Sequence, residues 1–247
     1  MTEPSPVRPN AGVRIGYEVS LIDSLRDLDD TTVRAVLAAY PSVTELKLVL
    51  ARLSRTWSRR YDRFATALAK YFAERALSST DAAFAASLRA AGLHSPRLAS
   101  TADIRTSLRA VIAENVSLIR SIPAQYHTQV EGIVMRGVQN GRDLHTVSTE
   151  LRLNYGVGVR RAALIARDQT NKANATFTRT RQIGLGIARA RWLHSRGGVT
   201  PRPEHVAFSG QEYDVAEGAL LDGKRVWPGT EINCRCVSVS IIPGLDR

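Results

Sequence analysis

Apolar residues recur at intervals of three and four along most of the first two thirds of the chain, which is the period of an amphipathic helix. The pattern predicts helical structure over 17–40, with a break at 29–32 where a second helix starts, and a longer helix over 43–76. Pro41 is expected to separate the two. Before them, residues 1–16 are rich in proline and poor in apolar side chains, so we expect an extended arm there.

Four shorter helical patterns follow, at 81–91, 102–121, 124–139 and 143–153. Pro123 is expected to close the second of them, and the Asn140-Gly141 pair marks a turn after the third. The run Tyr155-Gly156-Val157-Gly158 should interrupt the helix before a last long one, which ends near residue 182. The first two thirds of the chain are therefore predicted to be mostly helical.

The pattern changes after this last helix. Residues 189–194 are predicted to form a strand, glycines then punctuate short extended pieces, and alternation over 237–242 predicts a final strand. The fold class is therefore α+β: a mostly helical N-terminal region over 17–123, followed over 124–247 by a compact C-terminal domain with a long helix and a small antiparallel sheet.

The composition adds a strong basic balance. The 247 residues carry a formal net charge of +11, from 34 lysines and arginines against 23 acidic residues, and arginine supplies almost all of it. Such an excess favours binding to nucleic acid or to an acidic partner, whereas a solvated basic surface is the plain alternative. No apolar run of about 18 residues and no apolar leader is present, so we expect a protein made in the cytoplasm without a membrane span.

Two groups of basic side chains are candidates for contact with DNA or a protein partner. One is a stripe opposite the apolar face of the predicted 43–76 helix, and the other lies in the last long helix. They are Arg52, Arg55, Arg59 and Arg63, and then Arg161, Arg167, Lys172, Arg179 and Arg181. The alternatives are a solvated face for the first group and, for the second, ion pairs with Asp23, Asp27, Asp29 and Asp30.

Three motifs follow one another in the last third. The first is Arg161-Ala162-Ala163-Leu164-Ile165-Ala166-Arg167-Asp168-Gln169-Thr170-Asn171-Lys172; the second is Trp192, then Arg202-Pro203-Glu204-His205 and Gly210; the third is Pro228-Gly229, then Asn233-Cys234-Arg235-Cys236. Together they resemble the Mu F-like phage head morphogenesis family over roughly 124–243. Members of that family commonly have an acidic residue between the tryptophan and the Arg-x-x-His element, where this chain has Ser195-Arg196-Gly197-Gly198.

The resemblance implies a non-enzymatic minor capsid protein that enters the phage procapsid in few copies and lies inside the head of the virion. The implied partners are the portal protein, the scaffold or the major capsid protein. Genomic DNA is a further candidate partner, as a packaging or ejection factor would require. A nucleic-acid hydrolase that uses His205 is the alternative from another class, although the chain shows no paired carboxylates of the kind that a two-metal nuclease needs.

The histidine and cysteines of these motifs leave several interpretations open. Cys234 and Cys236 would point to the same face of a strand and, with His205, would supply three zinc ligands, with His194 or an acidic residue as the fourth. Without a cofactor, the cysteines would be small buried apolar residues, and a strained disulfide is the remaining alternative. Arg202, His205, Asn233 and Arg235 are expected to form a structural polar network between the last strand and the loop.

Overall fold

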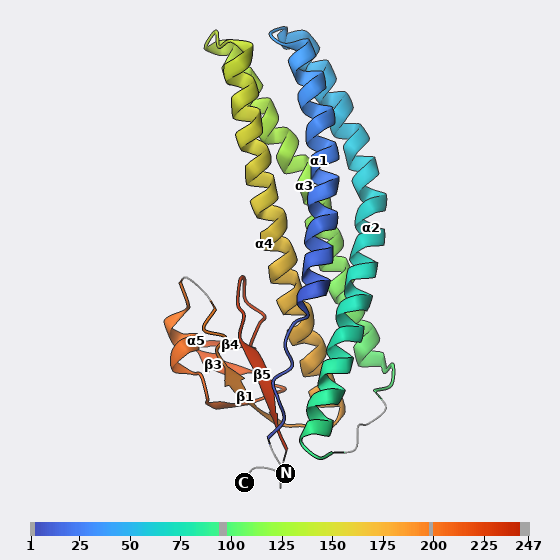
Figure 1. Cartoon of the computed structure of the whole chain (residues 1–247), viewed down its shortest axis with the longest axis vertical. Coiled ribbons are helices and arrows are strands. Elements are labelled where there is room, and N and C mark those ends of the chain that lie inside the picture. The colour runs from blue at the N-terminus through green and yellow to red at the C-terminus, as the bar shows by residue number, and fades with distance from the viewer. Residues whose placement is uncertain (1–2, 94–97, 198–199, 243–247) are drawn as a thin grey trace. The chain divides into compact units, whose positions relative to one another are not determined.

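The computed structural model describes residues 3–93, 98–197 and 200–242 of the chain (Figure 1). Its four long helices are α1 (Ala11–Ala39), α2 (Val43–Ala90), α3 (Ala102–Gln139) and α4 (Leu144–Gly184). The short elements that follow are β1 (Arg189–Leu193), α5 (Pro203–Ala207), β2 (Glu212–Asp214), β3 (Ala219–Leu221), β4 (Lys224–Val226) and β5 (Val237–Ile241). The predicted α+β class, with strands gathered at the C-terminal end, is confirmed.

Contacts divide the chain into two compact units, each assembled from segments that are distant in the sequence. The first, which we call the bundle unit, consists of residues 15–70 and 112–166. The second, which we call the sheet unit, consists of residues 1–14, 71–111 and 167–247. Each of the four long helices thus contributes residues to both units.

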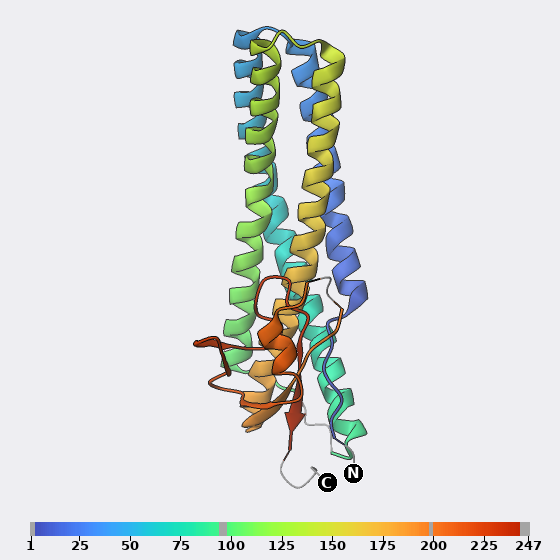
Figure 2. The same ribbon diagram turned by 90° about the vertical axis from the view of Figure 1, so that its left-hand side faces the viewer.

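In the bundle unit, four helical segments lie side by side around an apolar core (Figures 1 and 2). Each helix contributes an apolar face with the spacing that the sequence predicts. The fully or almost fully buried side chains include Tyr17, Leu21, Leu25, Leu28, Leu46, Trp57, Tyr61, Val130, Val134 and Leu151. The periodicity of apolar residues therefore identified the core of this unit.

Helix α1 is longer and more continuous than predicted. It begins at Ala11, where Oδ1 of Asn10 accepts a hydrogen bond from the N–H of Val13 (3.0 Å), so the extended arm ends at residue 10 instead of 16. The predicted break at 29–32 is wrong. Thr32 is fully buried with its Oγ1 3.4 Å from Nε2 of His127, and Asp29 accepts a hydrogen bond from Tyr126. Because α3 supplies these partners, polar residues that suggest a break are accommodated inside the helix.

Helix α2 also continues where the sequence suggested an end near residue 76 and a separate helix over 81–91. Polar residues in this stretch have partners on α4. Oγ1 of Thr80 lies 3.3 Å from Oδ1 of Asn174, and Asp81 accepts two hydrogen bonds from Arg181. Tertiary contacts therefore override the local signals for termination.

Two further predicted interruptions are absent. Pro123 lies inside α3, where the neighbouring Ile119, Ile122 and Tyr126 are buried and hold both sides of the proline in the core. The glycine run before residue 159 lies inside α4. A Cβ at Gly158 would approach Cδ2 of Leu25 to 2.7 Å, so this glycine permits close helix packing instead of ending a helix.

In the sheet unit, β1 is the central strand of a three-stranded antiparallel sheet in the order β2-β1-β5. A second sheet pairs β3 with β4. Nε2 of Gln182 on α4 donates to the Oγ atoms of Ser238 and Ser240 (3.0 Å each), which joins the helix to β5. The predicted strands at 189–194 and 237–242 are confirmed, each one residue shorter.

Among the described residues, no helix combines the length and apolar character needed to cross a bilayer.

Candidate functional site

The turn that contains the Asn-Cys-Arg-Cys motif is held against α4 by hydrogen bonds. Oδ1 of Asp168 accepts from the backbone N–H of Asn233 (2.7 Å), and Nδ2 of Asn171 donates to the carbonyl of Cys234 (2.9 Å). The guanidinium of Arg167 donates to Oδ1 of Asn233 at 3.2 and 3.1 Å. These contacts fix a backbone in which Asn233 takes the left-handed conformation, with φ of 60°. The first and third sequence motifs therefore meet in space.

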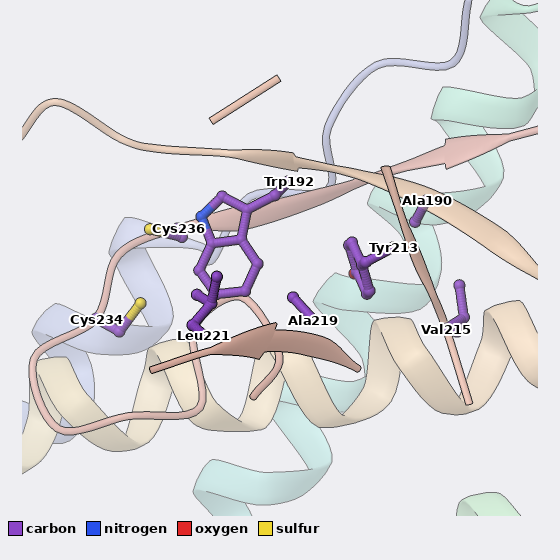
Figure 3. Close-up of a cluster of buried hydrophobic side chains, with 8 residues drawn as sticks. All are labelled: Ala190, Trp192, Tyr213, Val215, Ala219, Leu221, Cys234 and Cys236. Atoms are coloured by element: carbon purple, nitrogen blue, oxygen red, sulfur yellow. The ribbon is translucent and has the colours of Figure 1, made fainter. Parts of the chain in front are cut away.

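Trp192 on β1 belongs to a cluster of buried side chains beside this turn (Figure 3). The indole is fully buried and lies edge-on to the rings of His205, Phe208 and Tyr213, with centroid separations of 4.9, 5.9 and 6.2 Å. Figure 3 shows the indole nitrogen on the side of the ring that faces Cys236. The backbone N–H of Gly210 donates to the carbonyl of Trp192 (2.8 Å), so two residues of the second motif are in direct contact.

His205 and the two cysteines form a compact buried cluster. Nδ1 of His205 lies 3.5 Å from Sγ of Cys234 and 3.8 Å from Sγ of Cys236, and both cysteines are free thiols. The disulfide alternative is therefore not what the structure contains. The cysteines precede β5 instead of starting it, yet both sulfurs face the same imidazole. Within the part of the chain that the structure describes, these three residues form a group that could hold a metal ion.

A carboxylate occupies the other side of the imidazole. Nε2 of His205 lies 2.9 Å from Oε2 of Glu231, and Nε of Arg202 lies 3.3 Å from the same oxygen. Arg202 also donates through Nη2 to the carbonyl of Ile232 (3.0 Å). A carboxylate in contact with one ring nitrogen sets the tautomer of a histidine, so Nε2 carries the proton and Nδ1 presents its lone pair to the sulfurs.

The two thiols titrate as a pair. A hydrogen bond from Cys236 lowers the pKa of Cys234, against the opposing effect of burial, and the same contact raises the pKa of Cys236. The N–H of Gly229 also donates to Sγ of Cys234 (3.4 Å), in a backbone conformation with φ of 85°. The cluster therefore favours one negative charge on Cys234.

The sheet unit has one pocket lined by this cluster and a second that shares Ser195 and Arg235 with the first. One, of about 360 Å³, is lined by His194, Arg202, Arg235 and the three cluster residues, among others. The other, of about 470 Å³, is lined by four arginines: Arg8, Arg14, Arg167 and Arg235. Sequence reasoning missed Arg8 and Arg14 because nothing in residues 1–16 indicated that they lie beside the last motif.

The basic residues predicted on α4 make internal contacts. Arg181 is buried and its guanidinium binds both oxygens of Asp81, at 2.8 and 2.7 Å. Lys172 pairs with Asp168 (3.0 Å), and Arg179 stacks on Trp227 at 4.2 Å. In the bundle unit, Arg161 donates to Oγ of Ser121 (3.0 Å). The structure thus turns these side chains towards the protein.

Acidic residues that the sequence suggested as partners of those arginines pair with other side chains. Asp27 pairs with Arg60 and Asp23 with Arg26, each at 3.3 Å.

The arginine stripe on α2 faces solvent. All four of its side chains, Arg52, Arg55, Arg59 and Arg63, are exposed, and within the described parts of the chain none forms an ion pair.

The hydrolase alternative finds little support in this geometry. His205 is 3% exposed, with Nε2 against a carboxylate and Nδ1 against two sulfurs, so it does not present a free nitrogen to a substrate. Arg202, Asn233 and Arg235 likewise bind backbone or side-chain partners, Arg235 through the carbonyl of Gly197. Glu231, which sequence reasoning did not select, is the residue that organises the histidine.

Comparison with known proteins places these motifs in a family. Residues 128–239 match the model described as "Phage Mu protein F like protein", and every motif residue from Trp192 to Cys236 lies inside the match. An uncharacterized protein of Haemophilus influenzae is 29% identical over 150 residues, which cover 61% of this chain and 33% of that protein. This chain thus spans about a third of the length of that relative. No solved structure matches the chain. Residues 128–239, which include the Asn-Cys-Arg-Cys turn held against α4, are similar to the phage Mu protein F-like family.

Proposed function

We propose that this chain is a non-enzymatic minor capsid protein that acts in phage head morphogenesis and enters the procapsid near the portal. The observation that carries the proposal is the family match over residues 128–239, which contains the whole motif set. The expected partners are the portal protein, the scaffold or the major capsid protein, and the expected location is inside the head.

The contacts of the motif residues support a structural role. Asp168, Asn171 and Gly229 all bind the backbone or side chains of the Asn233–Cys236 turn, and Trp192 fills the cluster beside it. Residues that brace one another in this way stabilise a small domain. Such a domain is suited to hold a docking surface.

Assembly in a reconstituted system tests the proposal. The tagged full chain is co-expressed with the portal, scaffold and major capsid proteins of the same phage, and procapsids are isolated by sedimentation. We expect the chain to sediment with the procapsids and its incorporation to fall to background when the portal protein is omitted. Equal amounts in the procapsid fraction with and without portal would contradict a portal-dependent role, and absence from both would contradict incorporation.

DNA binding is a second candidate function, favoured by the exposed stripe of Arg52, Arg55, Arg59 and Arg63 on α2. Arginines three and four positions apart on one helix face can follow a phosphate backbone. The net charge of +11 adds long-range attraction to any polyanion. Binding of this kind would accompany packaging or ejection of the genome.

Salt dependence tests the DNA role on the stripe itself. Each phosphate contact contributes about 0.9 to the slope of log affinity against log salt, so Arg55→Gln/Arg59→Gln should lower that slope by about 2. The matched control is Arg105→Gln/Arg109→Gln, which removes two exposed arginines at the same spacing from α3. A flat salt response of the unaltered protein, or an equal loss in both double variants, argues against contact through the stripe.

A further inference from the structure

The cluster of His205, Cys234 and Cys236 has the geometry of a metal site as well as its residue types. Nδ1 of His205 and the two Sγ atoms all lie within 4.8 Å of one another, and all three residues are buried. Thiolate sulfur and imidazole nitrogen are the ligands that zinc prefers in proteins. We propose that these three residues bind a Zn²⁺ ion.

The distances between the ligand atoms agree with this ion. A tetrahedral zinc with bonds of about 2.3 Å to sulfur and about 2.0 Å to nitrogen separates the two kinds of ligand atom by about 3.5 Å. The observed separations from Nδ1 of His205 are 3.5 Å to Cys234 and 3.8 Å to Cys236. All three ligand atoms thus lie within a span that one ion can bridge.

Glu231 prepares the histidine for this role. Its Oε2 accepts the Nε2 proton of His205 at 2.9 Å, which leaves the Nδ1 lone pair directed at the sulfurs. Arg202 in turn holds the same carboxylate oxygen at 3.3 Å. A carboxylate behind a metal-binding histidine fixes the ring orientation and strengthens the ligand. Glu231 is therefore a positioning residue of the proposed site.

The fourth coordination position is assigned to solvent. The cluster forms part of the wall of the pocket of about 360 Å³, so water reaches it from that side. His194, which the sequence suggested as a fourth ligand, lines the same pocket, but its nitrogens do not belong to the group of clustered ligand atoms. Its Nδ1 accepts a hydrogen bond from the N–H of Arg196 at 3.2 Å. The site thus has three protein ligands and one exchangeable position.

The first experiment measures metal in the full-length protein purified under reducing conditions, without an affinity tag that binds metal. We expect about one zinc per chain by elemental analysis. Replacement of zinc by Co²⁺ should produce thiolate-to-cobalt charge-transfer absorption in the near ultraviolet and the visible bands of a tetrahedral ion. Protein that contains no zinc after growth with added zinc, and that gives no such cobalt spectrum, overturns the proposal.

Variants then assign the ligands. Cys234→Ser, Cys236→Ser and His205→Gln should each lose the metal, and Glu231→Gln should keep it with an affinity roughly 10- to 100-fold weaker. His194→Gln is the matched control, because it alters a histidine of the same pocket and should retain both zinc and the cobalt spectrum. Loss of metal in His194→Gln, or full retention in Cys234→Ser, contradicts the assigned ligand set.

Since unfolding would also release the metal from a ligand variant, helical circular dichroism is recorded for each one. The Glu231→Gln affinity does not depend on such a loss, since all three ligands remain in place. An unchanged affinity in this variant contradicts the positioning role of Glu231. These metal measurements involve neither capsid assembly nor DNA, so their failure leaves the proposed head function standing.

Discussion

At Gly229 both the backbone conformation and the surrounding atoms restrict the sequence to glycine. Its φ is 85°, and a Cβ there would lie 3.1 Å from Cβ of Ala175 and 3.2 Å from the carbonyl oxygen of Cys236. Gly210 has a similar φ of 88° but nothing within 4 Å of the same position. The two glycines therefore separate the cost of a left-handed backbone from the cost of crowding.

Alanine substitutions at these two glycines test that separation. Both substitutions should lower the free energy of unfolding by roughly 1–2 kcal/mol through the backbone conformation alone. Gly229→Ala should lower it by at least about 1 kcal/mol more, because its methyl group meets α4 and the motif turn. Urea unfolding of both variants and the unaltered protein, followed by fluorescence and circular dichroism, measures this. Equal losses at the two positions would show that crowding at Gly229 is relieved without cost.

Sequence reasoning found part of the site at this scale. His205, Cys234 and Cys236 were selected because their side-chain chemistry is distinctive whatever surrounds them. Glu231 was not, because a glutamate in a turn is ordinary until the fold brings its carboxylate to 2.9 Å from an imidazole. Asp168 lies in the first motif, but no local pattern predicted its bond to the Asn233 backbone, which joins residues 65 positions apart.

At the scale of elements, polar residues inside the helices are explained by partners on neighbouring helices. His127 on α3 is an example: it is 6% exposed, its Nε2 contacts Thr32 on α1, and burial lowers its pKa to about 4. The folded state therefore holds the neutral imidazole, whereas the unfolded chain binds a proton near the ordinary pKa of 6.5. The α1–α3 contact is thus sensitive to acid.

The sign of this effect follows from the lowered pKa. The contribution of neutral His127 is fully present above pH 6.5 and is lost as the pH falls towards about 4, because only the unfolded chain gains a proton over that interval. The free energy of unfolding should fall between pH 7 and pH 4.5 by about 2 kcal/mol more in the unaltered protein than in His127→Gln, after allowance for solvent screening. Urea unfolding of both at the two pH values measures the difference. A gap that does not change with pH contradicts the prediction.

The sequence indicated the type of nearly every element but misplaced several ends. Pro123 and Gly158 were interpreted as interruptions because each weakens a helix locally. Buried neighbours hold Pro123 within α3, and Leu25 packs against the space that Gly158 leaves open. Local propensity amounts to a few kcal/mol at most, and the burial of several large apolar side chains exceeds it.

At the scale of the whole molecule, the proposed zinc would act on one unit of the chain. Its ligands come from α5 and from the turn before β5, both in the sheet unit. A metal that joins two such segments stabilises the folded arrangement by its binding free energy. The bundle unit, residues 15–70 and 112–166, contains none of the ligands.

Removal of the metal should therefore affect the two units differently. After chelation, we expect faster hydrogen exchange in the backbone amides of β1, α5 and residues 231–241, with unchanged exchange in α1 from residue 15 to 39. Hydrogen exchange with mass spectrometry, on protein whose zinc content is measured before and after chelation, gives the comparison. Unchanged exchange in both units after verified loss of zinc would contradict a stabilising role for the ion.

The sequence by itself determined the helical character of the chain, the two longest strands, the basic charge and the motif set that lies within the family match. These depend on local periodicity, on residue counts and on short runs of side chains with distinctive chemistry. Only the tertiary structure decided that Arg181 binds Asp81 while Arg55 stays exposed, and that Glu231 sits behind His205. Those outcomes depend on contacts between residues far apart in the chain, and no local pattern encodes which partners such side chains will meet.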